Sequence, residues 1–176
     1  MTRAFLLVLV VLIFCFPAMG QDTPKAELFG GYAYAGTGSN GFDASIAANV
    51  NSWFGLVADV GGQYTRLDDQ GFTEKIHSHS FLFGPKFSLR RKRVVPFAHA
   101  LFGVAKLKTE TNEFGPLLSF SDTSFALALG GGLDVRVNDR FAIRVVQIDY
   151  LRTSFFGGSQ NKGRIAAGIV LRFGKK

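Results

Sequence analysis

The chain has 176 residues, a length that favours a single domain. Glycine (21) and phenylalanine (19) are abundant, 47% of the residues are hydrophobic and only 19% are charged, which favours twisted β-structure over a helical bundle. The net charge of +7 fits either nucleic acid or a phosphate-bearing membrane surface as a partner, and charge alone does not decide between them.

Residues 1–20 have the build of a secretory signal peptide. Arg3 gives a basic start, an apolar run covers residues 4–16, and Ala18-Met19-Gly20 places small residues three before and one before a cut ahead of Gln21. The run falls short of the roughly 20 residues of a spanning helix, so cleavage near Gly20 is favoured over an N-terminal anchor. An exported protein meets no genomic DNA, which argues against nucleic acid as a partner.

The only cysteine, Cys15, lies inside this segment. It follows Leu12-Ile13-Phe14 and not the small residue that a lipoprotein signal would place there. The mature chain, residues 21–176, is therefore expected to contain no disulfide, no thiol chemistry and no lipid anchor.

After the signal, large apolar residues alternate with small or polar ones at a period of two, as in strands with two different faces. In residues 123–137, Phe125 and Leu127 lie on one face, and Ala126 and Ala128 lie on the other. This segment is far longer than the roughly five or six residues of an ordinary sandwich strand. The expected strands are residues 27–35, 42–50, 54–64, 80–89, 94–108, 123–137, 141–152 and 164–173.

The sizes of the two faces predict which of them points outward. Eight strands enclose only a narrow interior, which Gly, Ala and Ser fit and so many Phe, Leu and Ile do not. The bulky face should therefore contact lipid, where only a closed barrel satisfies every backbone group. The expected fold is all-β, an eight-stranded antiparallel up-and-down transmembrane β-barrel over residues 21–176. A soluble lipocalin-like barrel remains the alternative.

The connections alternate in length. Residues 49–52, 90–93 and 138–140 read as short turns, whereas 36–41, 66–75, 109–121 and 153–161 read as longer loops. This arrangement is typical of periplasmic turns and extracellular loops, and it places both termini in the periplasm. Several loop residues are apolar, which hints at a partner, at lipid or at folding over the barrel mouth. They are Phe114, Leu117, Leu118, Phe120, Phe155 and Phe156.

Charged residues recur on the face predicted to line the lumen. The predicted lumen network comprises Glu27, Asp43, Asp59, Lys86, His99, Asp134, Arg136, Arg144, Asp149, Arg164 and Arg172. Buried charges persist only when they are paired, and two pairs follow from the hairpin registers: Asp134 with Arg144, and Asp149 with Arg164. A lumen filled in this way is a plug; the alternative is a charged lining that lets ions pass.

One strand breaks the alternation. Arg144 and Asp149 are separated by an odd number of positions, so both face inward only across an extra residue. The sequence therefore predicts a β-bulge near Val145-Val146.

The candidate chemistry is sparse, and no catalytic, metal or cofactor site is expected. His77 and His79 alternate with Ser78 and Ser80, so neighbouring Ser and His point to opposite faces and form no nucleophile–base pair. Two ligands without a nearby acid make a poor metal site. Gly130-Gly131-Gly132 lies within a strand, where it would permit bending and leave lumen space.

Aromatic and basic residues are placed as at membrane interfaces. The candidates for aromatic girdles are Tyr32, Tyr34, Trp53, Phe54, Tyr64 and Tyr150. The basic run over residues 90–93 would lie at the periplasmic headgroup level, either against anionic lipid or as a solvated turn.

Several segments resemble the small outer-membrane barrels of the OmpA/OmpX type, across the whole mature chain. They are Glu27-Leu28-Phe29-Gly30-Gly31-Tyr32, Asn51-Ser52-Trp53-Phe54-Gly55, Phe83-Gly84-Pro85-Lys86-Phe87, Pro96-Phe97-Ala98-His99-Ala100 and Leu171-Arg172-Phe173. The resemblance implies a Gram-negative outer-membrane protein, with Phe173 as the C-terminal strand signal for the barrel-assembly machinery. Gly174-Lys175-Lys176 departs from the terminal aromatic that the resemblance favours, and no peptidoglycan-binding domain follows.

The expected function is non-enzymatic: a structural or surface-interaction barrel with a plugged lumen. Its expected partners are outer-membrane lipid and an extracellular partner bound through the loops, and it is expected to be a monomer. A narrow porin-like channel is the second hypothesis. An outer-membrane lipid-modifying enzyme that uses His77 or His79 is the third.

Overall fold

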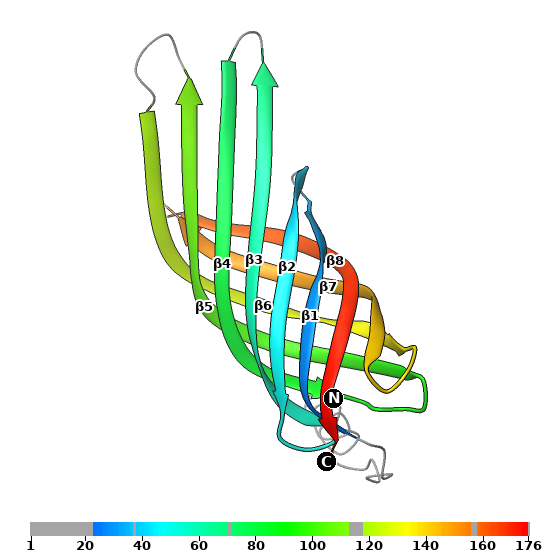
Figure 1. Ribbon diagram of the computed structural model, residues 1–176. Coiled ribbons are helices and arrows are strands. Elements are labelled where there is room, and N and C mark those ends of the chain that lie inside the picture. The colour runs from blue at the N-terminus through cyan, green and yellow to red at the C-terminus, as the bar shows by residue number, and fades with distance from the viewer. Residues whose placement is uncertain (1–22, 37, 70–71, 113–117, 156–157, 176) are drawn as a thin grey trace, which may run out of the picture.

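The computed structural model describes residues 23–36, 38–69, 72–112, 118–155 and 158–175, without the side chains of residues 66–69, 72–75, 110–112, 118–120, 155 and 175. Eight antiparallel strands form one closed barrel (Figure 1), which confirms the predicted fold. The strands are β1 (Pro24–Ala35), β2 (Ser39–Asn49), β3 (Phe54–Asp69), β4 (Phe72–Ser88), β5 (Val94–Asn112), β6 (Leu118–Arg136), β7 (Phe141–Phe155) and β8 (Gly158–Lys175).

Each strand pairs with its neighbours in the sequence, and β1 pairs with β8 to close the barrel, with Glu27 opposite Arg172. Closure gives the backbone of the wall a partner on both sides, which hydrocarbon surroundings require. Among the residues that the structure describes, no helix is long and apolar enough to cross a membrane.

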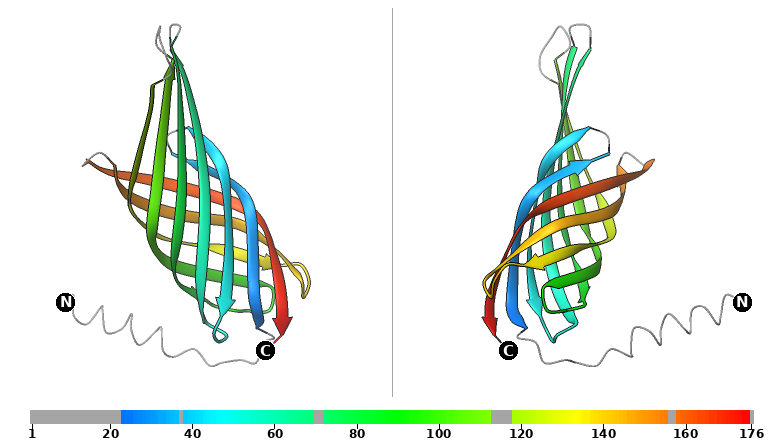
Figure 2. Two further views of the ribbon diagram at one scale, coloured as in Figure 1. Left: turned by 60° about the vertical axis from the view of Figure 1, so that its left-hand side comes forward. Right: turned by 90° about the vertical axis from the view of Figure 1, so that its right-hand side faces the viewer.

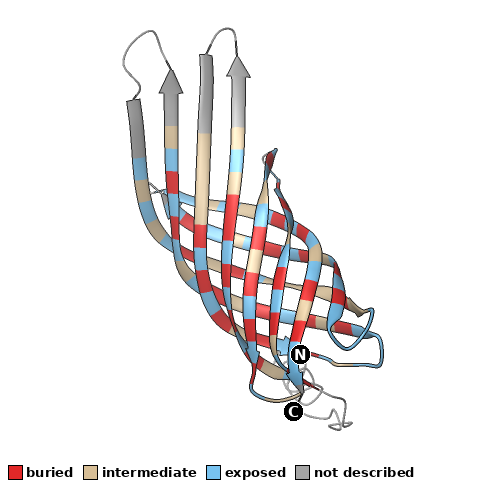
Figure 3. Ribbon diagram, viewed as in Figure 1, coloured by how far each residue is buried: buried red, intermediate tan, exposed pale blue. Residues whose placement is uncertain are grey.

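Buried and exposed residues alternate along most of each strand (Figure 3), and most of the bulky residues point outward as predicted. Phe81, Phe125 and Ile169 are more than half exposed, at 55%, 64% and 57%. A soluble barrel would reverse this arrangement, so the lipocalin-like alternative does not fit the side-chain directions.

The lumen also holds larger residues than the sequence analysis expected. Phe29, Phe97 and Leu101 are buried inside it, with exposed fractions of 2%, 6% and 0%. The two phenylalanine rings fit because glycines lie next to them on the inward face. A Cβ on Gly31 would lie 2.8 Å from Cζ of Phe29, and one on Gly132 would lie 2.8 Å from Cζ of Phe97. The inward face therefore combines large side chains with glycines, which leave the space that the large side chains fill.

Two of the three short turns share one sequence pattern, Val-Asn-x-x-Phe, at residues 50–54 and 137–141. In the first turn the Asn51 side-chain oxygen accepts hydrogen bonds from the backbone N–H groups of Trp53 and Phe54, at 3.0 and 2.7 Å. Asn138 makes the same two bonds in the second turn, both 2.8 Å long. Side-chain oxygens of this kind close tight turns by replacing a backbone acceptor.

The opposite end of the barrel differs from the prediction. Residues 66–75, 109–121 and 153–161 were predicted as loops. In the described parts of these segments the strands continue, and they pair as far as Asp69↔Phe72, Thr111↔Leu118 and Phe155↔Gly158. Beyond the membrane both faces of a sheet meet water, so the hydrophobic alternation stops although the backbone pairing continues. The sequence signal therefore ended earlier than the strands.

The continued strands β3–β6 form a four-stranded sheet that extends well beyond the rest of the barrel, on the side away from the chain termini (Figures 1 and 2). We call it the extension. Pairing of β2 with β3 ends at Asn40↔Tyr64, and pairing of β6 with β7 begins at Ala126↔Thr153. Within the described part of the chain, the backbone of residues 66–69 of β3 and 118–121 of β6 thus pairs with no strand on its outer side.

Candidate functional site: the charged lumen

Every strand contributes a charged or polar side chain to the lumen. Ten of the eleven predicted network residues are buried, with exposed fractions of 8% or less, and Arg136 is half-buried. They are Glu27 from β1, Asp43 from β2, Asp59 from β3, Lys86 from β4, His99 from β5, Asp134 and Arg136 from β6, Arg144 and Asp149 from β7, and Arg164 and Arg172 from β8.

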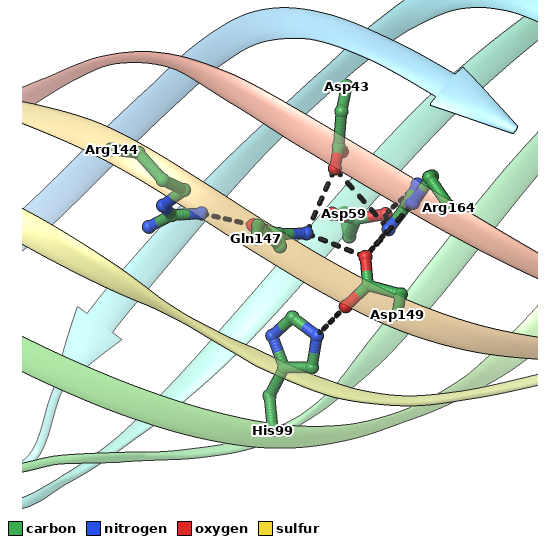
Figure 4. A network of polar contacts seen from close by, with 7 residues as sticks. All are labelled: Asp43, Asp59, His99, Arg144, Gln147, Asp149 and Arg164. Atoms are coloured by element: carbon green, nitrogen blue, oxygen red, sulfur yellow. Dashed lines mark hydrogen bonds and ion pairs between the residues drawn. The ribbon is translucent and has the colours of Figure 1, made fainter.

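The Arg164 cluster consists of Arg164 with Asp43, Asp59 and Asp149 (Figure 4). Nη2 of Arg164 lies 2.7 Å from Asp149 Oδ2, 3.3 Å from Asp59 Oδ1 and 3.4 Å from Asp43 Oδ2. The pair with Asp149 is the one predicted from the sequence. The contacts to β2 and β3 reach across the lumen, so one guanidinium links three separate parts of the wall.

Two further side chains complete this cluster. Gln147 donates through Nε2 to Asp43 Oδ2 at 3.0 Å and to Asp149 Oδ2 at 2.8 Å. His99 Nε2 lies 2.7 Å from Asp149 Oδ1. Hydrogen bonds of this kind stabilise carboxylates that burial alone would disfavour.

Arg144 occupies the middle of the lumen. It forms the predicted two-pronged pair with Asp134, through Nε to Oδ1 at 2.8 Å and through Nη2 to Oδ2 at 3.2 Å. Its remaining nitrogen donates to Gln147 Oε1 at 2.6 Å. The guanidinium carbon also lies 4.1 Å from the ring centre of Phe29 and 4.3 Å from that of Phe97, so the two phenyl rings provide cation–π partners.

The Glu27 cluster lies nearer the chain termini. Glu27 accepts from Lys86 Nζ at 3.1 Å and from Arg90 Nη1 at 2.8 Å, and Arg172 Nε lies 3.9 Å from the same carboxylate. The side chain of Arg90 is only 3% exposed. The prediction that residues 90–93 all lie at headgroup level is therefore wrong for Arg90. Its side chain points inward, where it pairs with the Glu27 carboxylate. Arg91, Lys92 and Arg93 are exposed as expected.

The predicted bulge is confirmed. On β6, Leu133 pairs with Val146 and the next residue, Asp134, pairs with Arg144, so Val145 is skipped. The register with β8 changes at the same place, between Arg144 and Gln147. Arg144 and Asp149 consequently both face inward although an odd number of positions separates them.

The glycines within strands make room for this network. A Cβ on Gly130 would overlap the Asp149 carboxylate, and one on Gly61 would lie 2.7 Å from Arg164 Nη1 and 2.8 Å from Ser80 Oγ. Within the Gly130-Gly131-Gly132 run, Gly130 thus leaves lumen space for the Asp149 carboxylate and Gly132 leaves space for the Phe97 ring.

The sequence analysis missed Gln147, Arg90, Phe29 and Phe97 as lumen residues. The bulge itself carried a signal for Gln147, because a residue two positions before Asp149 must share its face. The two phenylalanines occupy the same parity as Glu27 and His99, which the emphasis on small inward residues obscured. Arg90 gave no such signal, since it lies just outside β4.

His77 and His79 lie on the outer face of β4, and Ser78 and Ser80 line a lumen cavity. Each histidine ring forms a T-shaped contact with the ring of Tyr64, whose centre lies 5.3 Å from that of His77 and 5.8 Å from that of His79. The predicted separation of Ser from His is thus present. In the described part of the chain, no three His, Cys, Asp or Glu side chains are arranged to hold a metal ion.

Five of the six girdle candidates are exposed, and Phe54 is half-buried against Trp53 and Phe87. Trp53 stacks on Phe87 at 6.0 Å, beside the turn that joins β2 and β3. Phe173 is 52% exposed on the outer face of β8. The apolar loop residues Phe114, Leu117, Leu118, Phe120, Phe155 and Phe156 lie outside the residues or side chains that the structure describes.

A closed wall, an apolar outer belt and a polar lumen define a transmembrane β-barrel. The sequence agrees with this class. Residues 6–173 match the model of the outer membrane protein beta-barrel domain, and the chain belongs to this family. It is therefore a protein of the bacterial outer membrane.

Solved outer-membrane barrels share the fold. Ail, the attachment invasion locus protein of Yersinia pestis, is 19% identical, with a TM-score of 0.65, and the match covers 86% of this chain and 99% of Ail. The N-terminal barrel domain of Pseudomonas aeruginosa OprF is 12% identical, with a TM-score of 0.54 and coverages of 87% and 100%. Neisserial surface protein A is 16% identical, with a TM-score of 0.51 and coverages of 84% and 94%. No curated protein sequence matches the chain.

Proposed function

We propose that this protein is a non-enzymatic surface-interaction barrel, which acts through its extracellular face while its lumen is plugged by paired charges. The proposal includes cleavage of the signal near Gly20, insertion by the barrel-assembly machinery and a monomeric state in outer-membrane lipid. The extension is the observation that carries it, because a barrel that served only as a channel or an anchor would not need strands far beyond the membrane.

The extension offers two strand edges beyond the last backbone pairs with β2 and β7, on residues 66–69 of β3 and 118–121 of β6. An exposed edge presents a row of backbone N–H and C=O groups that a strand of another protein can pair with. Both edges lie on the side away from the termini, where transmembrane barrels face the exterior. The surface available for a partner is therefore the extension.

The lumen supports this proposal by disfavouring transport. The Arg164 cluster, Arg144 with Asp134, and the Glu27 cluster succeed one another along the barrel and reach across it. A cavity of about 50 Å³ opens beyond Arg164 and has Arg164 in its lining. A channel would have to separate ion pairs buried in the lumen, at a cost of several kcal/mol for each charge left unpaired.

Bacterial adhesion tests the surface role. The gene is expressed in a non-adherent Gram-negative host, and binding of the cells to immobilised heparin and to extracellular-matrix protein is counted. Heparin is a fitting probe because Ail was crystallised with the heparin analogue sucrose octasulfate. Full-length protein should raise adhesion to at least one surface above the empty vector.

The decisive variant shortens both hairpins by joining Thr65 to Ile76 and Thr109 to Phe120 through tight turns, at paired positions of the sheet. It should abolish the adhesion and keep the heat-modifiable gel migration of a folded barrel. A matched control replaces only residues 70–71 and 113–117 and should still adhere. Equal adhesion of the shortened variant, or no adhesion of the full chain, would contradict the proposal.

A further inference from the structure

Two arginines at the end of the lumen near the chain termini have no hydrogen-bonded acid. Nε and Nη2 of Arg136 are buried, and no hydrogen-bond partner reaches them from the described part of the chain. Nε of Arg172 lies 3.9 Å from Glu27 Oε1, which is too far for a hydrogen bond. The two Glu27 oxygens already accept from Lys86 and Arg90, at 3.1 and 2.8 Å. The charged network described above therefore leaves these two guanidinium groups unsatisfied.

The two arginines face the same part of the lumen from β6 and β8. Arg136 lies opposite Ala142 of β7, and Ala142 lies opposite Val170 of β8. Ala142 and Val170 are buried, with 4% and 1% exposed, so this row points inward. Arg172 follows Val170 by two positions and shares its face. Neighbouring strands are about 4.8 Å apart, so β6 and β8 are about 10 Å apart with only the short Ala142 side chain between them.

Positive charge exceeds negative charge around this row. Among the charges that act on Arg172, those of Arg136 and Arg90 repel it. Those of Glu27 and Asp139 attract it, but Glu27 already binds two other cations. The acid that follows Leu133 on β6 is held in the two-pronged pair described above. A buried guanidinium without an acceptor costs free energy, which a bound anion would recover.

The position of the two arginines selects ligands from the periplasm. The short turns of a transmembrane barrel face the periplasm, and both arginines lie at or near strand ends on that side. Their neighbours Val137 and Phe173 are 61% and 52% exposed on the outer face. Lipid therefore meets these neighbours, and an anion reaches the inward guanidinium groups from the periplasm. Exposed basic side chains around this end attract anions toward it. They are Lys25, Arg91, Arg93 and Arg140.

We propose that Arg136 and Arg172 together bind the terminal carboxylate of a peptide in the periplasm. A carboxylate has two oxygens in one plane, and each oxygen can accept hydrogen bonds from one guanidinium group. A lipid phosphate carries a suitable charge but is tied to the hydrocarbon on the other side of the wall. The site lies at the opposite end of the barrel from the extension, so it adds a second binding role to the proposed surface interaction.

The test uses the folded, full barrel in phosphatidylcholine nanodiscs, which contain no anionic lipid. N-acetyl-trialanine with a free carboxylate is titrated, and the side-chain Nε–Hε NMR signals of Arg136 and Arg172 report binding. Both signals should shift and saturate. The same peptide with a C-terminal amide is the matched control and should shift neither. Absence of shifts with the free carboxylate, or equal shifts with the amide or with inorganic phosphate, would overturn the proposal.

The variant R136Q should weaken peptide binding by roughly tenfold, the effect of losing one hydrogen bond to a charged group. It should still fold, because Arg136 has no partner to lose among the described residues. The control R91Q removes the same charge from the exposed turn at this end and should change the affinity by less than about twofold, since exposed charges are screened. Heat-modifiable migration verifies folding of both variants. Equal binding by R136Q and the unaltered chain would contradict the proposed site.

The chain's own Asp22, which directly precedes the described residues, is the competing occupant. The variant D22N removes this carboxylate, and the peptide should bind to it and to the unaltered chain alike. Binding that appears only in D22N would overturn the proposal, because Asp22 would then be the ligand of the two arginines.

Discussion

At the scale of single residues, Arg164 shows how the lumen tolerates so many charges. Its guanidinium is 2% exposed and contacts three carboxylates that are themselves buried. Gln147 and His99 supply further donors to the same oxygens. A buried ion pair stabilises the fold little more than a well-packed apolar pair would. Removing one partner is nevertheless strongly destabilising, because the other charge then stays buried without compensation.

Replacing Arg164 with methionine should therefore be severe. The variant keeps the approximate size of the side chain and leaves Asp43, Asp59 and Asp149 without their shared cation. We expect the free energy of unfolding to fall by about 3–5 kcal/mol, measured by guanidinium titration of the barrel in vesicles. Arg152→Met, on an exposed residue of the neighbouring strand, is the control and should have little effect. Equal unfolding midpoints would show that the three carboxylates do not depend on Arg164.

Glycine 130 provides a second test at this scale. A methyl group there would collide with the Asp149 carboxylate and with the backbone oxygen of Ile148. Gly130→Ala should lower the free energy of unfolding by about 1–3 kcal/mol, as overpacking does. Gly30 is the matched control, because a Cβ at that position has nothing within 4 Å. If Gly130→Ala and Gly30→Ala unfold at the same denaturant concentration, the close packing around Asp149 is not required.

At the scale of the element, the strand segments inside the membrane could be predicted from the sequence, and the strand segments beyond the membrane could not. The lipid belt forces period-two alternation, so the central parts of all eight strands and the bulge in β7 could be predicted. The extension was read as loops because water on both sides of a sheet removes that pattern. Its strands are held together by backbone hydrogen bonds. These bonds require no particular side chains, so the sequence of residues 65–69 shows no strand pattern.

The bulge makes a prediction about deletions. Removing Val145 would turn β7 into a regular strand in which Arg144, Gln147 and Asp149 still face inward and keep their partners. This variant should fold. Deleting Ile169, an outward residue of β8 without a bulge, should prevent folding, since either Arg164 or Arg172 would then face lipid at a cost of about 2–4 kcal/mol. Heat-modifiable migration distinguishes the two deletions, and failure of the Val145 deletion alone would refute this account of the bulge.

At the scale of the whole molecule, the candidate site was predictable only between neighbouring strands. The pairs Asp134–Arg144 and Asp149–Arg164 follow from hairpin registers. The contacts of Arg164 with Asp43 and Asp59 cross the lumen, and they depend on strand tilt and closure, which no local pattern encodes. Arg90 is a similar case, since its partner Glu27 lies 63 residues away.

The proposed plug predicts the electrical behaviour of the molecule. In planar lipid bilayers, a barrel whose lumen is closed by buried ion pairs should give no steady unitary conductance at moderate voltages. A known porin reconstituted in parallel serves as the positive control. Regular, ion-selective current steps from the purified barrel would favour the narrow-channel hypothesis over the plug.

Both clusters extend across the contact between the first and last strands. Arg164 and Arg172 come from β8, while their acids come from β1, β2 and β3 as well as from β7. If β8 closed on β1 one residue out of register, its arginines would turn toward lipid and leave unpaired acids inside. The lumen charges should therefore favour the correct seam during assembly, because only the barrel that closes in register pairs Arg164 and Arg172 with their acids.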